Sequence, residues 1–394
     1  MMTKQWIISQ KKSDNIFKQI LISRGINEAG IDAFLNPKFF EDMEDPYKMN
    51  NMKKSIARIN QAMIKRQKVV IFGDYDADGI PGSVLLYEAL KKLGIDVSVY
   101  IAKRAEGYGL NNTIIQKFIN QGNGLVICVD NGTKNVKEIK KYQEKLDFLI
   151  CDHHEVGKII PKAILLNPKQ NNCKYPFKDL CGCGVVYKFV QALQKEFPQY
   201  IELNDLKWWS ELVAISTICD VVPLIGENRV FAKFGLMALR KTKRVGLKKL
   251  YEVAQINQEE ITAYTIGFQI GPRLNAPARL NMHNESFLLL STDDQKEAEQ
   301  LAYKLNNANL KRQKILQQTL SKALKIIEKE KTYKNKLILV SGRNWPQGVV
   351  GLVAGKIVEA YARPAIVLST DGITSKGSAR SIDGFHMVEA LEKT

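Results

Sequence analysis

Histidine is rare in this chain, and two of its four histidines stand together in Asp152-His153-His154. These residues follow Phe148-Leu149-Ile150-Cys151, an apolar run that predicts a buried strand. More acidic residues occupy similar positions elsewhere: Asp74, Asp76 and Asp78 in one loop, then Asp130, then Asp220. Carboxylates and imidazoles gathered at strand ends indicate a metal site that handles phosphate.

The residue types narrow the metal and its chemistry. Carboxylate oxygens suit magnesium and manganese, and one or two imidazoles tilt the choice toward manganese. Two such divalent ions, about 3.5–4 Å apart, can activate a water and stabilise the leaving oxygen of a phosphoester. The chain has no Walker lysine motif and no Gly-x-Gly-x-x-Gly after a strand, so nucleotide-driven or nicotinamide chemistry lacks support.

Each motif also has a plainer interpretation. The run Gly73-Asp74-Tyr75-Asp76-Ala77-Asp78-Gly79 resembles the start of an EF-hand loop, but Leu85 stands where that loop needs a bidentate glutamate. Asp130-Asn131-Gly132 alone is typical of a turn, and Asp220 alone could end a helix in a salt bridge. The four motifs together favour a divalent-metal site.

Short strands separated by helix-length connections must position these side chains. Such alternation predicts a mostly parallel sheet. Ligands of parallel sheets bind beyond the carboxyl ends of the strands, so the acidic residues after the first, third and fourth strands are placed to converge. The predicted strands are 69–72, 95–101, 125–129, 148–151 and 163–166, followed by 337–340 and 366–368 in a second α/β unit.

The pattern along the chain divides it into four expected segments. Helices are predicted over 51–66, 82–92, 184–196, 206–219 and 293–330. At about 1.5 Å per residue, the last of these is long enough to bridge two domains. The expected segments are a helical cap (1–50), a catalytic domain (51–230), a helical region ending in the long connecting helix (231–330) and a partial second α/β domain (331–394).

The chain carries 58 Lys and Arg against 41 Asp and Glu, a formal net charge of +17. This excess favours a polyanionic partner, although a solvated basic surface would give the same balance. No apolar run is long enough to span a bilayer, so no membrane partner is expected. Six scattered cysteines, several of them in apolar runs, are typical of reduced core thiols in the cytoplasm.

Several basic residues stand where they could hold phosphate. Arg104 follows the second predicted strand, and Arg273 and Arg279 flank a predicted Asn-Ala-Pro turn. Ser378 and Arg380 lie in the second α/β unit. Arginine suits bidentate phosphate contacts, but each of these alone is more often a surface residue.

The order and composition of the motifs resemble those of a known family. Gly-Asp-Tyr-Asp-Ala-Asp-Gly (73–79), Val-Asp-Asn-Gly (129–132), Asp-His-His (152–154) and Asp-Val-Val-Pro-Leu (220–224) look like the four metal motifs of the DHH phosphoesterase superfamily. Further segments resemble its RecJ type, the single-strand-specific 5′→3′ DNA exonucleases: 100–110, 176–186, 226–229, 271–279, 348–354 and 377–381. The resemblance implies an α/β fold with a parallel-sheet DHH domain, a long connecting helix and a partial α/β DHH-associated domain.

The resemblance also assigns roles. Asp76, Asp78, Asp130, His153 and Asp220 fall on the family's metal ligands, with Asp130 the bridge and Asp74 a supporting ligand. His154 falls on the histidine that contacts the scissile phosphate and assists proton transfer, which makes His154 and Asp76 the expected catalytic residues. Substrate binding is implied for Arg104, Ser378 and Arg380 near the 5′-phosphate, and for Arg273 and Arg279 along the strand.

The chain departs from the family pattern at several positions. Phe72 stands where many members have a histidine, Pro277 where a small residue is usual, and Trp345-Pro346-Gln347-Gly348 replaces a histidine-containing motif. The sequence ends at Thr394, before the family's glycine-histidine-rich motif and OB-fold domain. We therefore expect a shortened, split or phage-type member, or an interrupted gene.

The expected function is hydrolysis of single-stranded DNA from its 5′ end in DNA repair or recombination. It would depend on two divalent metal ions, manganese or magnesium, and would proceed in the cytoplasm beside a helicase or single-strand-binding protein. Two alternatives stay open: a phosphodiesterase of short oligonucleotides or cyclic dinucleotides, and a catalytically impaired DNA-binding or partner protein.

Overall fold

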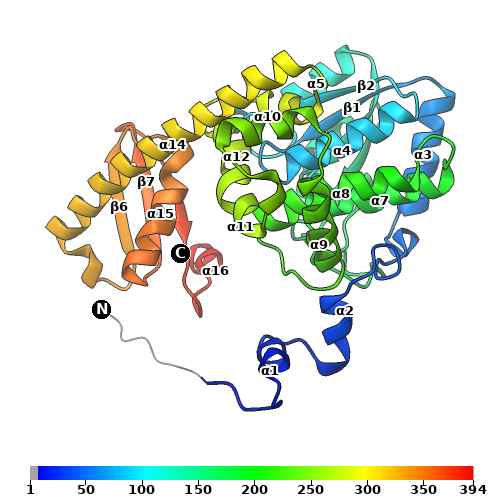
Figure 1. Ribbon diagram of the computed structural model, residues 1–394. Helices are drawn as coiled ribbons and strands as arrows, with labels where there is room; N and C mark the ends of the chain where they lie inside the picture. Colours follow the sequence, from blue (N-terminus) through cyan, green and yellow to red (C-terminus); the bar gives the residue numbers. More distant parts are fainter. Residues whose placement is uncertain (1–7, 394) are drawn as a thin grey trace. The chain divides into compact units, whose positions relative to one another are not determined.

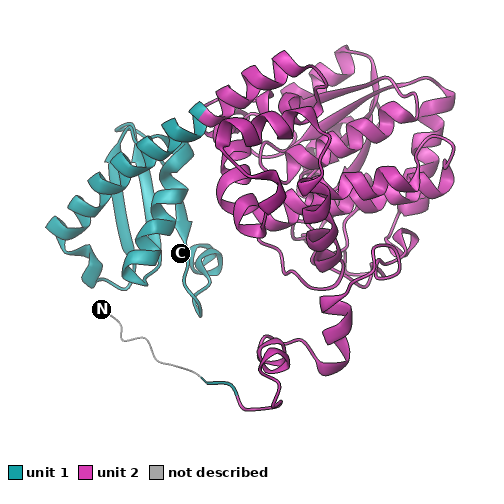
Figure 2. Ribbon diagram, viewed as in Figure 1, with its two compact units in different colours: residues 1–9, 307–394 teal, residues 10–306 magenta. Residues whose placement is uncertain are grey.

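The computed structural model describes residues 8–393, so the outermost residues of the predicted segments 1–50 and 331–394 lie outside the described residues. The chain divides into two units (Figure 2). Of the described residues, the larger unit holds 10–306, and the smaller holds 307–393 together with 8 and 9. Helix α14 (Gln295–Glu330) begins in the larger unit and continues into the smaller one, and it confirms the long helix predicted over 293–330.

A five-stranded sheet forms the centre of the larger unit (Figure 1). Its strands run in the order β2-β1-β3-β4-β5, and every neighbouring pair is parallel. The predicted parallel sheet is therefore confirmed. The strands are β1 (Lys68–Gly73), β2 (Val97–Ile101), β3 (Asn123–Val129), β4 (Asp147–Cys151) and β5 (Ile164–Leu166).

Helices cover both faces of this sheet, because successive side chains of a strand point to opposite faces and both sets are apolar here. Val69 and Ile71 of β1 belong to the core that also takes in the helices on one face. Val70 and Phe72 pack with the helices on the other face. The first face carries α3 (Met52–Ile64), α4 (Gly79–Lys92), α7 (Gly182–Glu196) and α8 (Leu203–Cys219); the second carries α5 (Asn112–Asn120) and α6 (Val136–Tyr142).

The segment before α3 is anchored to the larger unit by a buried polar network. Lys188 of α7 is fully buried, pairs with Glu227 at 2.8 Å and donates to the backbone carbonyl of Glu44 at 2.6 Å. Glu227 also accepts hydrogen bonds from the Tyr175 hydroxyl and from the Glu44 N–H. This network therefore joins the N-terminal segment to the core. The elements of that segment are α1 (Ile16–Ser23), η1 (Glu28–Gly30), α2 (Ile31–Leu35) and η2 (Pro46–Lys48).

A helical region completes the larger unit and corrects one expectation. The Asn-Ala-Pro stretch is not a turn but part of helix α12, which runs from Gly271 to Arg279. Pro272 lies in the first turn of α12, and Pro277 lies close to its end. The other elements are η3 (Arg104–Glu106), α9 (Gly226–Arg240), α10 (Val245–Ala254), η4 (Gln258–Glu260), α11 (Ala263–Thr265), the π-helical turn η5 (Ile266–Ile270) and α13 (Glu285–Ser291).

The smaller unit is a three-stranded sheet with helices. Its order is β6-β7-β8, with β6 and β7 parallel and β8 antiparallel to β7. The sequence did not predict β8, because its residues Ser-Lys-Gly-Ser-Ala-Arg show no apolar alternation. The elements are η6 (Thr332–Lys334), β6 (Ile338–Arg343), α15 (Gln347–Tyr361), β7 (Ala365–Thr370), β8 (Ser375–Arg380) and α16 (Met387–Glu392).

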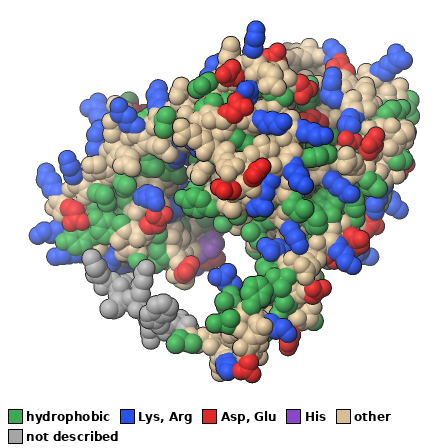
Figure 3. Space-filling view, in the orientation of Figure 1, with side chains coloured by type: hydrophobic (Ala, Val, Ile, Leu, Met, Phe, Trp, Pro, Cys, Tyr) green, Lys and Arg blue, Asp and Glu red, His purple; other side chains and the backbone are tan. Residues whose placement is uncertain are grey.

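Two surface properties bear on partners. Within residues 8–393, no helix combines the length and apolar character that crossing a bilayer requires. Figure 3 shows Lys and Arg side chains spread over the drawn face rather than confined to one stripe.

Candidate metal centre

The acidic and histidine motifs converge at the carboxyl edge of the parallel sheet. Asp74, Asp130 and Asp152 directly follow β1, β3 and β4, and Asp220 caps the end of α8. In the described part of the chain, three overlapping groups bring possible metal-binding atoms within 4.8 Å of one another: Asp74 with Asp76 and Asp130, Asp78 with His153 and Asp220, and Asp130 with His153 and His154. The structure thus gathers all seven residues predicted as ligands or catalytic groups.

Asp130 lies at the centre of this cluster. Its Oδ1 is 3.3 Å from His153 Nε2, and the same imidazole nitrogen is 3.6 Å from Asp78 Oδ2 and 3.7 Å from Asp220 Oδ2. The Asp130 carboxylate is buried, yet its Oδ1 accepts no hydrogen bond. A buried carboxylate oxygen without a donor is costly unless a cation satisfies it, so these residues fit a divalent metal.

The electrostatics of the cluster favour the same ligand. Burial and the neighbouring Asp76 raise the pKa of Asp74 to about 7, and burial and Asp78 raise the pKa of Asp220 to about 7. Burial and the carboxylate of Asp78 also raise the pKa of Asp130 well above its usual range. Burial lowers the pKa of His153, which keeps its imidazole neutral and able to act as a ligand. A bound cation would offset the repulsion among these carboxylates.

Backbone N–H groups orient two of the carboxylates. Asp76 Oδ1 accepts from the N–H groups of Asp78 and Gly79, where α4 begins. Asp78 accepts from the N–H groups of Gly182 at 2.6 Å and Cys183 at 2.8 Å, which are the first residues of α7. Unpaired N–H groups at a helix start attract negative charge, so α7 holds the Asp78 carboxylate in place.

The space around Gly182 also requires a residue without a side chain. A Cβ atom at this position would lie 2.7 Å from Asp130 Oδ1 and 2.8 Å from the Asp130 Cβ. Contacts this short force a shift of the carboxylate. Gly182 therefore lets α7 approach the cluster closely enough to bind Asp78.

Asp152 orients His154. The Asp152 Oδ1 accepts from His154 Nδ1 at 2.8 Å, and its Oδ2 accepts from the Thr133 N–H at 3.0 Å. Burial alone would raise the pKa of Asp152, but the hydrogen bonds from His154 and Thr133 hold it below its usual range. Burial alone would lower the pKa of His154, but the hydrogen bond to Asp152 raises it. The Asp152 carboxylate therefore fixes the Nδ1 side of the His154 ring.

Two residues that the sequence did not single out support the site. The Tyr108 hydroxyl donates to the Asp130 carbonyl at 3.1 Å and lies 3.1 Å and 3.3 Å from the two ring nitrogens of His154. Asn275 Oδ1 accepts from the Ala77 N–H at 2.8 Å, which fixes the acidic loop to α12. Both contacts join segments distant in sequence, and the only sequence signal for them is that each residue lies in a stretch that resembles the family.

The predicted substrate residues fall into two groups. Arg104 lies over the Tyr75 ring at 4.7 Å, and the charges of Arg104 and Arg279 lower the pKa of Tyr75 against the larger effects of its burial and of Asp74. These two arginines therefore lie beside the acidic loop. Arg273 donates to the Gln269 carbonyl and to Asn306 Oδ1.

Ser378 and Arg380 belong to the smaller unit. Arg380 Nη1 donates to Ser378 Oγ at 3.3 Å. A Cβ atom at Gly351 of α15 would lie 3.0 Å from Ser378 Oγ and 3.3 Å from Arg380 Nη2, so both side chains lie against that helix.

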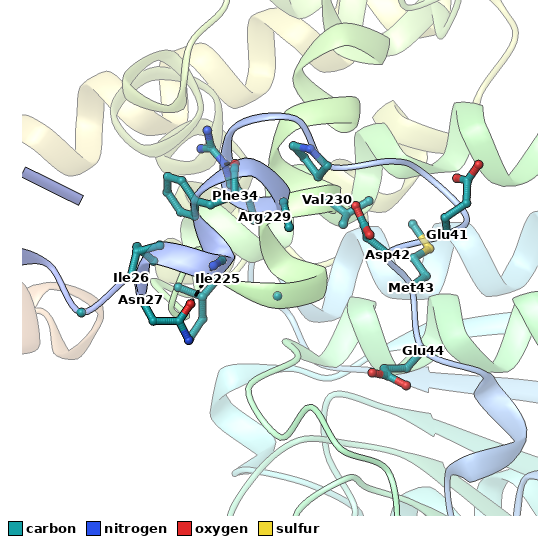
Figure 4. A pocket seen from close by; sticks show the side chains of 15 residues that line it. Ile26, Asn27, Phe34, Glu41, Asp42, Met43, Glu44, Ile225, Arg229 and Val230 are labelled. Atoms are coloured by element: carbon teal, nitrogen blue, oxygen red, sulfur yellow. Dashed lines mark hydrogen bonds between the residues drawn. The ribbon is translucent and has the colours of Figure 1, made fainter. Parts of the chain in front are cut away.

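A cavity of about 550 Å³ lies elsewhere in the larger unit, between the N-terminal segment and α9 (Figure 4). The Arg229 guanidinium stacks over the Phe34 ring at 4.3 Å and donates to the Phe34 carbonyl. The residues lining this cavity include none of the predicted site residues.

The fold and the donor cluster define an α/β protein with a candidate divalent-metal centre at the edge of a parallel sheet, and comparisons with known proteins agree. The family "DHH family, N-terminal domain" matches residues 68–217. A solved structure, exonuclease RecJ bound to manganese, is 30% identical with a TM-score of 0.76, and the match covers 87% of this chain and 85% of that one. RecJ from Thermus thermophilus, solved with Mn²⁺, is 28% identical with a TM-score of 0.80, over 94% of this chain and 52% of that one.

Curated proteins give the same result. The single-stranded-DNA-specific exonuclease RecJ of Bacillus subtilis is 41% identical over 381 residues, which cover 95% of this chain and 47% of that protein. The protein of the same description from Haemophilus influenzae is 35% identical, over 90% of this chain and 64% of that protein. The chain thus spans less than two thirds of the length of these relatives. It belongs to the DHH family and is of the RecJ type.

Proposed function

We propose that this protein is a metal-dependent exonuclease that hydrolyses single-stranded DNA from its 5′ end. The observation that carries the proposal is the buried Asp130 oxygen without a hydrogen-bond donor. Asp130 belongs to two of the three groups of carboxylates and imidazoles whose possible ligand atoms lie within 4.8 Å of one another. The names of the relatives, single-stranded-DNA-specific exonucleases, supply the substrate class.

The donor groups suit two cations that share Asp130. Asp74, Asp76 and Asp130 would hold one, and Asp78, Asp130, His153 and Asp220 the other. Manganese and magnesium are both consistent with this set of ligands, and RecJ structures contain each of them. When bound, the two ions supply a polarised phosphate and a water of lowered pKa.

Side chains of the protein would contact the scissile phosphate and transfer the proton. Asp152 holds His154 Nδ1, so His154 Nε2, which lies 3.3 Å from the Tyr108 hydroxyl, is the nitrogen that would contact the scissile phosphate and transfer a proton. Asp76 caps the start of α4 with one carboxylate oxygen and has the other for a metal. His154 and Asp76 are accordingly the proposed catalytic residues.

We further propose that the strand is held by the predicted basic residues. Arg104 and Arg279 lie beside the acidic loop, where they can bind phosphate oxygens, and Arg273 would extend this contact along the strand. Ser378 and Arg380 would bind the 5′-phosphate, with residues 331–394 acting as a substrate-binding domain. The proposed division assigns 51–230 to catalysis, 1–50 to the cap and 231–330 to the helical connection.

We also propose, from the state of its cysteines, that the protein works in the cytoplasm. All six are free thiols, and five of them are buried, which suits a protein kept reduced in the cytoplasm. A helicase or a single-strand-binding protein stays a predicted partner.

The experiment that tests the function compares substrates in Mn²⁺. We expect release of mononucleotides from 5′-phosphorylated single strands, with the 5′ label lost before the 3′ label, and much slower release from duplex DNA. EDTA should stop the reaction. Release from dinucleotides but not from long strands would replace the proposal with the short-oligonucleotide alternative. Binding of single strands without turnover in any divalent metal would replace it with the impaired-protein alternative.

Tyr108→Phe is expected to lower kcat by up to about tenfold, because it removes one neutral hydrogen bond that fixes the His154 ring. The KM for single strands should change little, since Tyr108 contacts His154 and Asp130 rather than the predicted phosphate-binding residues. Steady-state kinetics on a 5′-phosphorylated oligonucleotide check both values. An unchanged kcat would remove Tyr108 from the positioning of His154.

A further inference from the structure

Two large aromatic side chains are exposed together near the end of α8. Tyr264 is 65% exposed and Phe268 is 69% exposed. Their rings are already stacked, with centroids 4.7 Å apart and an interplanar angle of 25°. Single exposed apolar residues are ordinary, but a pair of stacked aromatic rings facing water presents a preformed flat apolar surface.

The segment that carries these rings packs directly on the helix that delivers Asp220. Tyr264 belongs to α11 and Phe268 to the π-helical turn η5. A Cβ atom at Gly267 would lie 3.8 Å from Ile218, and one at Gly271 would lie 2.3 Å from Cys219 Sγ. Ile218 and Cys219 immediately precede Asp220, so the segment that carries the aromatic pair packs against the residues next to a predicted metal ligand.

The same segment is fixed to the site at a second point. Helix α12 follows η5 without a break, and its Asn275 accepts a hydrogen bond from Ala77 in the acidic loop. Arg279 at the end of α12 acts electrostatically on Tyr75 of that loop. The aromatic rings and the arginines predicted to bind phosphate therefore come from one continuous helical stretch, and π-helical turns are frequent at functional sites.

We propose that Tyr264 and Phe268 form a stacking platform for the nucleobases of the single strand near the metal centre. Every base has a flat face, so such a platform binds a strand without selecting its sequence, while arginines hold the phosphates. The chain's net charge of +17 favours a polyanionic partner, and predicted phosphate-binding arginines lie on the same helical stretch as the rings. The platform rests on the proposed function, and it adds a recognition element to which no role was assigned from the sequence.

The test uses the full chain in Mn²⁺ with a 5′-phosphorylated, phosphorothioate-linked oligonucleotide that resists hydrolysis. 2-Aminopurine is placed at successive positions, because stacking quenches its fluorescence. The double variant Tyr264→Ala/Phe268→Ala is expected to weaken binding about 5- to 150-fold and to abolish quenching at one or two positions. The exchange Tyr264→Phe/Phe268→Tyr keeps both rings and should restore binding and quenching.

Tyr200→Ala is the matched control. Tyr200 is 46% exposed and lies beyond the C-terminal end of α7, whose opposite end binds Asp78. Over fifteen residues, the two ends of α7 are about 22 Å apart. Thermal unfolding of every variant confirms that the fold is retained.

The outcomes separate this proposal from the proposed function. If the wild type binds and degrades single strands while the double alanine variant binds with equal affinity and equal quenching, the platform is wrong and the exonuclease stands. A wild type that neither binds nor cleaves single strands overturns both. Conversion of a wild-type dimer to a monomer, with DNA binding unchanged, would mark the ring pair as a contact between copies and would also overturn the platform.

Discussion

Asp130→Asn is expected to lower metal-dependent hydrolysis by about a thousandfold or more, and at the same time to raise the thermal stability of the metal-free protein. The loss follows because this carboxylate is the one that both proposed cations share, and metal stabilisation of a phosphoester transition state supplies several kcal/mol. The gain follows because burial and the neighbouring carboxylates raise the pKa of Asp130, so ionising this group costs stability in the metal-free fold, and asparagine avoids that cost.

The stability effect has a defined pH dependence. Asp74 and Asp220 have folded-state pKa values of about 7, above the value of about 4 in an unfolded chain. The folded protein therefore binds more protons than the unfolded chain between these values, and the metal-free fold loses stability as the pH rises from about 4 to 7. Mn²⁺ should restore that stability at pH 8 in the wild type but not in Asp130→Asn.

Thermal unfolding at pH 5.5 and pH 8, with Mn²⁺ and with EDTA, measures both effects. Asp96→Asn is the control, since it removes the same charge from an exposed residue before β2 and should leave hydrolysis and metal-dependent stabilisation as in the wild type. Full hydrolysis by Asp130→Asn would show that Asp130 does not bridge the metals.

Gly182→Ala should reduce Mn²⁺ affinity at least tenfold and hydrolysis about a hundredfold in a protein that still folds. The added methyl group would meet the Asp130 carboxylate at 2.7–2.9 Å, and relief requires movement of either Asp130 or the start of α7, which binds Asp78. Gly182 is the first residue of α7, and alanine is a good helix former, so the helix itself should still form. Loss of metal binding would therefore come from geometry rather than from unfolding.

Gly355→Ala is the matched control for Gly182→Ala. Gly355 also lies in a helix, α15, but a Cβ atom there would have no neighbour within 4 Å, so this change should leave Mn²⁺ binding and hydrolysis unaltered. Titration calorimetry with Mn²⁺ and far-UV circular dichroism measure the two variants side by side. Equal Mn²⁺ affinity in Gly182→Ala and the wild type would contradict the prediction, because it would show that the Asp130 carboxylate can shift without weakening metal binding.

The sequence was sufficient to predict where the candidate site lies. Each acidic motif follows an apolar run, and in a parallel sheet the ends of such strands meet at one edge. This rule alone brings Asp74, Asp130 and Asp152 together, and the sheet order agrees with it. The strands were predictable because they are buried on both faces and read as continuous apolar runs.

Other features depend on contacts that the sequence does not encode locally. The hydrogen bond from the Gly182 N–H at the start of α7 to Asp78 joins residues more than a hundred positions apart. Nothing in the sequence around Gly182 indicates that a carboxylate lies beside it. The Asn-Ala-Pro stretch was predicted as a turn because proline usually ends helices, whereas Pro277 here lies inside α12, close to its end. Strand β8 was missed because its side chains are polar and its pairing with β7 supplies the order.

The buried pair of Lys188 and Glu227 has an evolutionary consequence. Loss of either partner leaves a buried charge uncompensated and costs about 3–5 kcal/mol, whereas joint replacement by apolar residues is often neutral. Substitution one position at a time therefore passes through a destabilised intermediate. Among relatives, the two positions should change together or not at all, and Tyr175, whose hydroxyl donates to the same carboxylate, should change with them.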